Sequence, residues 1–194
     1  MKFFFIILFV QNLFSLDLKE GDIIFQETNS EQSRAIKLAT KSKYTHVGIV
    51  LSYNSKLMIL EAIGPVKVTE IDSFLKRSLN QNFKIKRLKN ANQILTKEKL
   101  EQLKIEGNKY LGKPYDIYFG WSNDRIYCSE LVWKLYKTVL NIEIGKLSKL
   151  KEFDLSHWKV RYLMFKRYGL SIPYDETVIP PSNLFDSELL ITIE

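Results

Sequence analysis

Cysteine is almost absent from this chain: its 194 residues include one, Cys128, so no disulfide can form within it. There are only two histidines, His46 and His157. They lie far apart, and with one cysteine they give no spacing typical of a zinc site. Internal repeats and low-complexity tracts are also lacking. We therefore expect a protein that uses neither a metal ion nor another cofactor, and whose single thiol needs an explanation.

Long apolar runs are equally scarce. Residues 3–14 are nearly all apolar, but Gln11 and Asn12 interrupt them, and about 20 apolar residues are needed to span a bilayer. Lys2 precedes this run, and Ser15 follows it as a small residue at a plausible cleavage point. This pattern predicts a secretory signal peptide over residues 1–15 and export to the periplasm or the medium. With 45% hydrophobic and 26% charged residues, we expect residues 16–194 to form one globular domain.

Basic residues exceed acidic ones, giving a formal net charge of +7. This charge suits an anionic cell-envelope polymer or contact with a membrane surface, whereas nucleic acid is not expected as a partner outside the cytoplasm. Lys and Arg are dispersed and form no single block, which favours a simple role in solubility. No obligate protein partner is predicted.

The single cysteine begins an amphipathic segment. Leu131, Leu135 and Val139 recur at the four-residue spacing of one helical face, so Cys128 lies in the first turn of a helix. Free backbone N–H groups and the helix dipole there stabilise a thiolate and an oxyanion. The alternative is that Cys128 is a small buried hydrophobe. Because export would favour paired cysteines, an unpaired thiol suggests chemistry.

A histidine and a glutamate interrupt two apolar strands. Residues 44–52 and 56–63 predict a hairpin, in which opposed residues have a constant sum of numbers. A two- or four-residue loop makes that sum odd, such as 107 or 109, and places His46 and Glu61 on the same side. Beside an unpaired thiol, such a pair indicates a cysteine hydrolase, with His46 as the base and Glu61 as its orienting group.

Further elements follow from periodicity and capping signals. Strands are expected over residues 21–26, 66–69, 83–88 and 189–193, and helices from near Thr28, over 71–79 and over 96–111. A basic helix over 157–168 carries four aromatic residues that we expect to pack in the core, namely Trp158, Tyr162, Phe165 and Tyr168. The mixed order of strands and helices predicts an α+β domain.

Several short motifs, in this order and spacing, resemble the YiiX-type permuted papain-like amidases, relatives of the NlpC-type cell-wall peptidases. The motifs are GDIIFQ, YTHVGIV, Glu61-Ala62, GKPYD and YCSELVWKLY, within residues 19–140. The resemblance implies a circularly permuted papain-like fold, with an antiparallel sheet packed against helices and the cysteine at a helix N-terminus. The catalytic residues then run in the order His46, Glu61, Cys128.

The same resemblance assigns residues around the cysteine. It implies that Tyr115, in the loop before Cys128, contributes a hydroxyl to the site. Tyr127 and Ser129, which flank the cysteine, are assigned to substrate and oxyanion binding. Tyr127 replaces an Asp of the unpermuted relatives and Glu130 replaces a Gly, so their cell-wall specificity need not carry across.

We expect an exported thiol-dependent hydrolase that cleaves amide bonds in cell-wall peptides or small amino-acid conjugates. One alternative is lipid deacylation or acyl transfer of the lecithin:retinol acyltransferase type. A long apolar channel would favour lipid, whereas a short polar cleft would favour a peptide terminus. The other alternative is a non-catalytic envelope-binding domain that keeps the fold.

Overall fold

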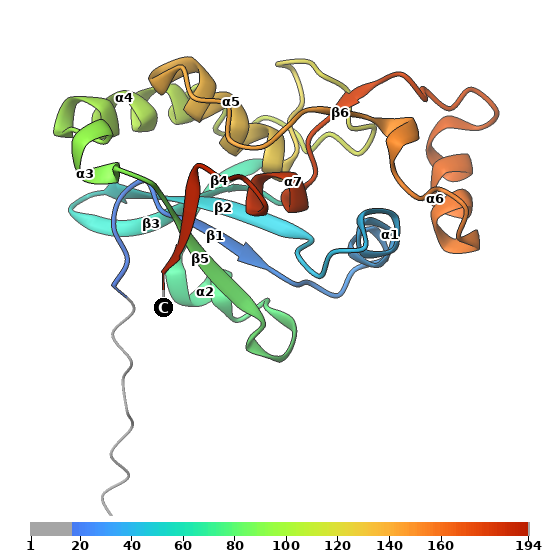
Figure 1. Cartoon of the computed structure of the whole chain (residues 1–194), viewed down its shortest axis with the longest axis horizontal. Helices are drawn as coiled ribbons and strands as arrows, with labels where there is room; N and C mark the ends of the chain where they lie inside the picture. The colour runs from blue at the N-terminus through green and yellow to red at the C-terminus, as the bar shows by residue number, and fades with distance from the viewer. Residues whose placement is uncertain (1–16, 194) are drawn as a thin grey trace, which may run out of the picture.

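The computed structural model describes residues 17–193, and the predicted signal peptide over residues 1–15 lies outside the described residues. Its centre is an antiparallel sheet of six strands in the order β4-β3-β2-β1-β5-β8 (Figure 1). The strands are β1 Ile23–Gln26, β2 His46–Tyr53, β3 Lys56–Ala62, β4 Val66–Glu70, β5 Phe83–Leu88 and β8 Leu190–Ile193. A separate two-stranded ribbon pairs β6 Ser148–Lys149 with β7 Thr177–Val178.

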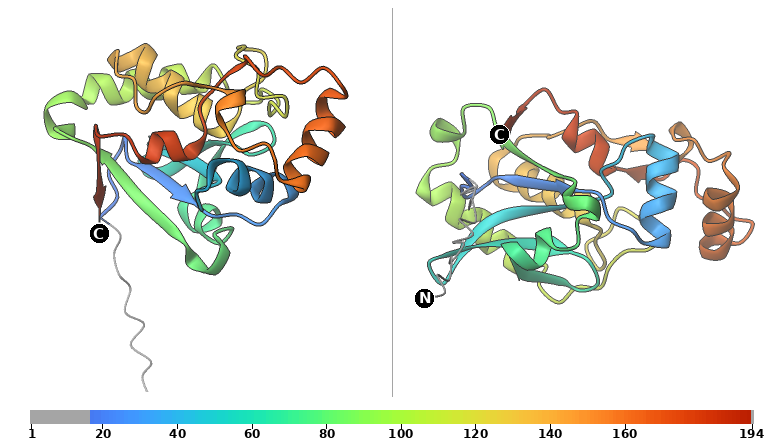
Figure 2. Two further views of the ribbon diagram at one scale, coloured as in Figure 1. Left: turned by 45° about the vertical axis from the view of Figure 1, so that its right-hand side comes forward. Right: turned by 90° about the horizontal axis from the view of Figure 1, so that it is seen from below.

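The helices divide between the two faces of the sheet and one end of the molecule. They are α1 Glu31–Thr40, α2 Ile71–Leu75, α3 Ala91–Ile94, α4 Lys97–Asn108, α5 Cys128–Leu140, α6 Trp158–Tyr168 and α7 Pro181–Phe185, with 3-10 turns at Leu79–Gln81 and Leu150–Glu152. In Figure 1, α4 and α5 cover one face of the sheet and α2 covers the other. Figure 2 shows α1 and α6 together at one end, beyond the strands. One antiparallel sheet with helices packed on both faces confirms the predicted α+β class.

The hairpin of β2 and β3 has the register that brings the candidate residues together. Ile49 faces Leu60, so opposed residue numbers sum to 109, one of the predicted values. Asn54 and Ser55 form the two-residue loop, with φ of 51° and 62°. Positive φ at both positions is what the strand twist requires in a tight hairpin, and Asn tolerates it. His46 and Glu61 consequently project on the same side of the sheet.

Helix α5 packs on the face of the sheet opposite to the side on which His46 and Glu61 project, and it contributes much of the core. Leu131, Val132 and Leu135 are fully buried there. Gly107 of α4 permits close packing of that helix against β3, because a Cβ atom at position 107 would lie 2.5 Å from Leu60 Cδ2. Asn141, in the left-handed region with φ of 55°, ends α5. The apolar stripe read from the sequence thus fixes where Cys128 sits.

Two local predictions are wrong. Helix α1 begins at Glu31, not near Thr28: the Ser30 hydroxyl caps it by accepting a hydrogen bond from Ser33 N at 2.9 Å, while Thr28 bonds to Thr45. In α6 the aromatic side chains Trp158, Tyr162 and Phe165 are 68%, 55% and 59% exposed. A helix packed on one side buries one stripe, and in α6 that stripe is Val160, Leu163 and Met164.

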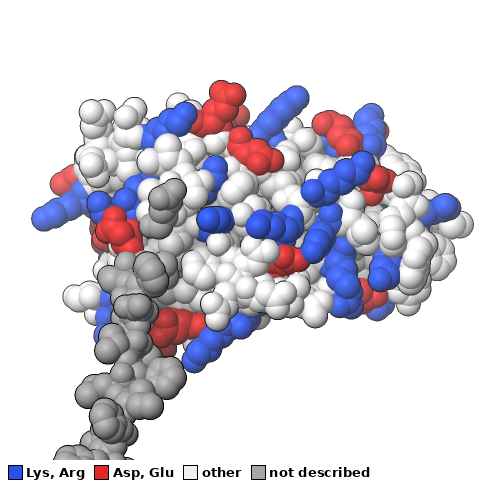
Figure 3. Space-filling view, turned by 60° about the horizontal axis from the view of Figure 1, so that its bottom comes forward, with Lys and Arg blue, Asp and Glu red and all other residues white. Residues whose placement is uncertain are grey.

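Charge is spread over the molecule as the sequence suggested. Figure 3 shows Lys and Arg side chains across one face with acidic side chains between them, and basic groups gather toward the right-hand end. Within residues 17–193, no helix is both long and apolar enough to cross a membrane.

Candidate active site

His46 and Glu61 form a buried hydrogen-bonded pair. Nε2 of His46 lies 2.6 Å from Oε2 of Glu61, and Glu61 is fully buried. The hydroxyl of Thr69 donates to Glu61 Oε1 at 2.7 Å, and Nη2 of Arg77 lies 2.6 Å from both carboxylate oxygens. Burial alone would raise the pKa of Glu61, but these hydrogen bonds and charges hold it below its usual value. Glu61 is therefore an anion that fixes the imidazole ring.

The Cys128 sulfur lies close to His46, to the backbone N–H of Val47 and to the hydroxyl of Tyr115. Burial would raise the pKa of Cys128, yet these partners, His46 foremost, lower it. Burial likewise opposes protonation of His46, but its bonds to Cys128 and Glu61 raise its pKa to about 9. The arrangement favours a thiolate beside an imidazolium.

A second chain of hydrogen bonds reaches the sulfur through Tyr115. Arg167 Nη2 donates to Gln32 Oε1 at 2.7 Å, and Gln32 Nε2 donates to the Tyr115 hydroxyl at 2.8 Å. Burial, and then the neighbouring Cys128, place the pKa of Tyr115 well above its usual value, so the hydroxyl keeps its proton. Because its oxygen accepts from Gln32, its own hydrogen remains available for donation toward the neighbouring Cys128. Each bond in this chain is polarised toward Cys128 by the guanidinium at its end.

The residues flanking Cys128 differ in their surroundings. The Tyr127 hydroxyl accepts a hydrogen bond from Ile179 N at 3.0 Å, which ties the 178–181 segment to the start of α5. Ser129 is 1% exposed, and its hydroxyl has no hydrogen-bond partner among the described residues. Glu130 accepts from the Tyr127 N–H at 3.3 Å and pairs with Lys134 at 2.7 Å, which fixes the first turn of the helix.

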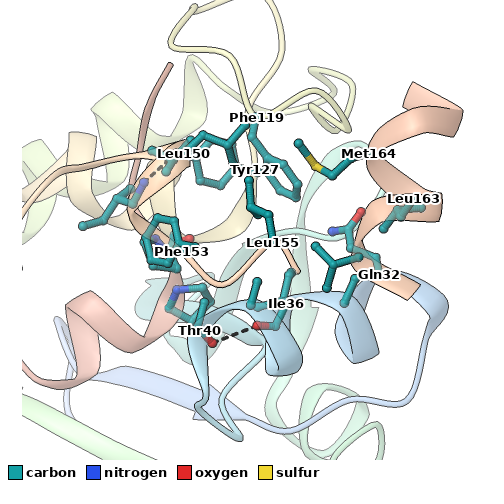
Figure 4. Close-up of a pocket in the computed structure, with 18 of the residues that line it drawn as sticks. Gln32, Ile36, Thr40, Phe119, Tyr127, Leu150, Phe153, Leu155, Leu163 and Met164 are labelled. Atoms are coloured by element: carbon teal, nitrogen blue, oxygen red, sulfur yellow. Dashed lines mark hydrogen bonds between the residues drawn. The ribbon is translucent and has the colours of Figure 1, made fainter. Parts of the chain in front are cut away.

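An apolar pocket opens onto Cys128 (Figure 4). Ile36 of α1 lies on one side, Leu163 and Met164 of α6 on another, and Phe119 and Tyr127 close the top. The cavity volume of the pocket is about 90 Å³. Its polar lining is confined to a few side chains, among them Gln32, Tyr115, Ser129 and Arg167.

The structure brings together Cys128, His46, Glu61 and Tyr115, and it places Tyr127 and Ser129 along the pocket. Sequence reasoning missed Thr69, Arg77, Gln32 and Arg167. Thr69 had a usable signal, since it lies on the strand paired with β3 and shares the side of Glu61. The others come from α1, α6 and the turn after α2, whose positions depend on tertiary packing.

Comparison with known proteins agrees with this geometry. The chain is 42% identical over 180 residues to the uncharacterized protein YiiX of Escherichia coli strain K12, covering 93% of this chain and 88% of that one. The crystal structure of the metalloprotein yiiX from Escherichia coli O157:H7 superimposes with a TM-score of 0.86 at 43% identity, covering 91% of this chain and 96% of that one.

A family model covers nearly the whole chain. It spans residues 17–194 and describes a permuted papain-like amidase enzyme. His46, Glu61 and Cys128 follow one another in this order along the chain and converge in space. The chain belongs to the YaeF/YiiX, C92 family of permuted papain-like amidases.

Proposed function

We propose that this protein hydrolyses amides of apolar acyl groups, with Cys128 as nucleophile, His46 as general acid and base, and Glu61 as the residue that orients His46. The observation that carries the substrate class is the apolar pocket that opens onto the Cys128 sulfur. Two observations support the chemistry: His46 lowers the pKa of the buried Cys128 thiol, and Nε2 of His46 is 2.6 Å from Glu61.

Acylation begins with the thiolate. Its sulfur attacks the carbonyl carbon of the amide, and the carbonyl oxygen becomes an oxyanion. His46, protonated at the nitrogen that faces Cys128, gives this proton to the leaving nitrogen, and the C–N bond breaks. The products of this half-reaction are a free amine and a thioester on Cys128. Glu61 stabilises the imidazolium throughout without accepting its proton.

We assign three groups to stabilisation of the oxyanion. The backbone N–H of Cys128 is unpaired within α5 because it lies in the first turn. The Tyr115 hydroxyl lies close to the sulfur and its hydrogen is available for donation, so we place it beside the carbon under attack. The buried Ser129 hydroxyl lines the pocket without a partner of its own among residues 17–193. Donors held in place by the fold cost little to reorganise during reaction.

Deacylation uses the same groups in reverse. His46, now neutral, takes a proton from water, and the resulting hydroxide attacks the thioester carbonyl. The C–S bond breaks, the free carboxylic acid leaves, and the thiolate and imidazolium re-form. Transfer to an alcohol or amine in place of water would give the acyltransferase expected as an alternative from the sequence.

The pocket lining favours one of the two substrate classes expected from the sequence. A peptidoglycan stem peptide is polar and charged and would need several polar partners. The lining here is mostly aliphatic and aromatic, from Ile36 on α1 to Leu163 on α6. Burying such a surface against an alkyl chain is favourable, whereas burying unpaired peptide groups there is costly. We therefore favour a fatty acyl amide over a cell-wall peptide.

A second candidate substrate is an apolar amino-acid conjugate with a free carboxylate. Arg167 favours it: the guanidinium lines the pocket, and no carboxylate in residues 17–193 forms an ion pair with it. A substrate carboxylate would supply the missing charge.

A metal ion does not fit this donor set. The solved Escherichia coli relative is described as a metalloprotein. In this chain Cys128 and His46 offer two donors, while the Glu61 oxygens are occupied by His46, Thr69 and Arg77. The part of the chain that the structure describes contains no group of three or more His, Cys, Asp or Glu side chains placed to hold an ion.

We also propose that residues 1–15 direct export, which would place the enzyme where envelope lipids and acylated conjugates are accessible.

The experiment is a comparison of substrates at equal concentration. Acyl-glycines from acetyl to palmitoyl and a peptidoglycan stem peptide are incubated with the protein, and the products are identified by mass. We expect hydrolysis of the long-chain acyl-glycines, abolished by Cys128→Ala. Cleavage of the stem peptide alone would overturn the substrate class, and activity that survives Cys128→Ala would overturn the mechanism.

A further inference from the structure

The outward face of α6 is unusual because it exposes large aromatic side chains. Trp158, Tyr162 and Phe165 recur at the spacing of one helical stripe and are 68%, 55% and 59% exposed. Leu170, just past the end of the helix, is 94% exposed. Exposed aromatic side chains along one helical stripe mark a surface that another protein or a membrane covers.

The charge around this stripe has one sign. From residue 155 to 174 the chain contains four basic residues and no acidic one. Lys159, Arg161 and Lys166 are exposed, and of these three only Lys166 lies near a carboxylate, 3.9 Å from Glu31. Tryptophan and tyrosine flanked by Lys and Arg are the composition of helices that lie in a membrane interface, where rings sit at headgroup level and cations attract anionic lipids.

The inner face of the same helix lines the pocket. Val160, Leu163 and Met164 face α1 across the apolar pocket that leads to Cys128. In Figure 1 and Figure 2, α6 lies at the end of the molecule beside α1, away from the sheet and free on its outer side. A surface touched by α6 would therefore adjoin the pocket.

We propose that the outward face of α6, formed by Trp158, Tyr162, Phe165, Lys159, Arg161 and Lys166, docks onto the surface of an anionic lipid bilayer. The helix lies flat, with its rings among the headgroups and its basic side chains against lipid phosphates. A lipid acyl chain then reaches the pocket past α6 without crossing bulk water. That last step rests on the proposed function, whereas the docking does not.

The docking is tested on the full chain with phosphatidylcholine vesicles, with or without an equal part of phosphatidylglycerol. Emission of Trp158 is obtained as the difference between the protein and its Trp158→Phe variant. Brominated lipids quench indole only at close range. We expect quenching of Trp158 by anionic vesicles, little quenching by phosphatidylcholine alone, and loss of quenching at high salt. An unquenched Trp158 would overturn the proposal.

Matched charge reversals separate the contribution of α6 to vesicle binding from general electrostatic attraction. They also separate it from any contribution of the N-terminal segment, which is the same in all variants. Lys159→Glu, Arg161→Glu and Lys166→Glu together should weaken vesicle partitioning by at least about tenfold. Lys84→Glu, Lys89→Glu and Lys97→Glu change net charge equally at exposed positions elsewhere and should weaken it much less. Equal losses would contradict docking through α6. Unchanged thermal melting shows that both variants fold.

Two further outcomes keep the docking distinct from the enzyme proposal. Docking should persist in Cys128→Ala, which is expected to have no turnover. If the unmodified chain docks but hydrolyses no amide, only the proposed function is refuted. If Tyr162→Asp instead turns a dimer into a monomer in sedimentation and vesicles do not quench Trp158, the face is an interface between copies and the docking is refuted.

Discussion

Nη2 of Arg77 lies 2.6 Å from both carboxylate oxygens of Glu61, and one of these oxygens, Oε2, also lies 2.6 Å from Nε2 of His46. Burial raises the pKa of Glu61, but its hydrogen bond to His46, the hydroxyl of Thr69 and the charge of Arg77 together lower it, so the carboxylate stays ionised and fixes the His46 ring. Arg77 thus positions the catalytic base through Glu61 without touching the sulfur.

Removing this guanidinium should slow catalysis without abolishing it. For Arg77→Met we expect kcat to fall by about one to two orders of magnitude, less than direct loss of the residue that orients the base. KM should change little, because Arg77 does not line the pocket. Arg77→Lys should restore part of kcat. The wild type, Arg77→Met and Arg77→Lys are compared by steady-state kinetics on one acyl-glycine. An unchanged kcat in Arg77→Met would contradict this role.

The thiolate should persist at pH values where an ordinary cysteine is protonated. Because His46 lowers the pKa of Cys128, alkylation by iodoacetamide should stay near its plateau as pH falls from 9 to neutrality. In His46→Ala, burial remains without the partner, so the rate at pH 7 should drop and rise only above about pH 8.5.

Hydrolysis has an upper limit as well. The leaving nitrogen needs the His46 proton, so kcat/KM should fall as pH passes about 9, where the raised pKa of His46 is crossed.

The pH profile of Cys128 alkylation by iodoacetamide is obtained from pseudo-first-order labelling followed by mass spectrometry. Superimposable profiles for wild type and His46→Ala would show that His46 does not activate the thiol.

Loss of the Tyr115 hydroxyl should act mainly on kcat. Tyr115→Phe keeps the ring and removes the donor, and loss of one oxyanion donor costs about 10²–10³ in kcat. Gln32→Leu should give a smaller loss, since Tyr115 then loses the hydrogen bond that holds its hydroxyl. Tyr118→Phe is the matched control, an exposed tyrosine of the same loop. If Tyr115→Phe and Tyr118→Phe behave alike, Tyr115 has no part in the reaction.

The pocket should set the preferred acyl length. Ala39 lines it, so Ala39→Phe places a ring in the space of the acyl chain. We expect kcat/KM for palmitoyl-glycine to fall by at least about tenfold, because several buried methylene groups lose their site at about 0.8 kcal/mol each. The acetyl compound should react as before. An equal loss for both lengths would indicate general damage and not a filled pocket.

Much of the site could be predicted from the sequence because its local signals agree. The alternation of side chains on 44–52 and 56–63 placed His46 and Glu61 on one side whatever the odd register, and the observed sum of 109 confirms it. The stripe of Leu131 and Leu135 placed Cys128 at a helix start. The pairing of these two units in space came from the family resemblance, which the comparisons confirm.

The rest depends on long-range packing. Arg77 follows a five-residue helix whose position over β3 has no local signature. The chain from Arg167 through Gln32 to Tyr115 joins residues more than 80 positions apart. The aromatic stripe of α6 was expected in the core because aromatic residues usually are; periodicity shows that a helix has two faces but not which one meets the protein.

The most direct test of the thioester mechanism is the intact mass of the protein after rapid acid quenching during turnover of palmitoyl-glycine. We expect a transient increase by one palmitoyl group, located on the peptide that contains Cys128. The adduct should be absent in Cys128→Ala and should form more slowly in His46→Ala. Product release without any adduct, at a rate unchanged in Cys128→Ala, would contradict the thioester mechanism.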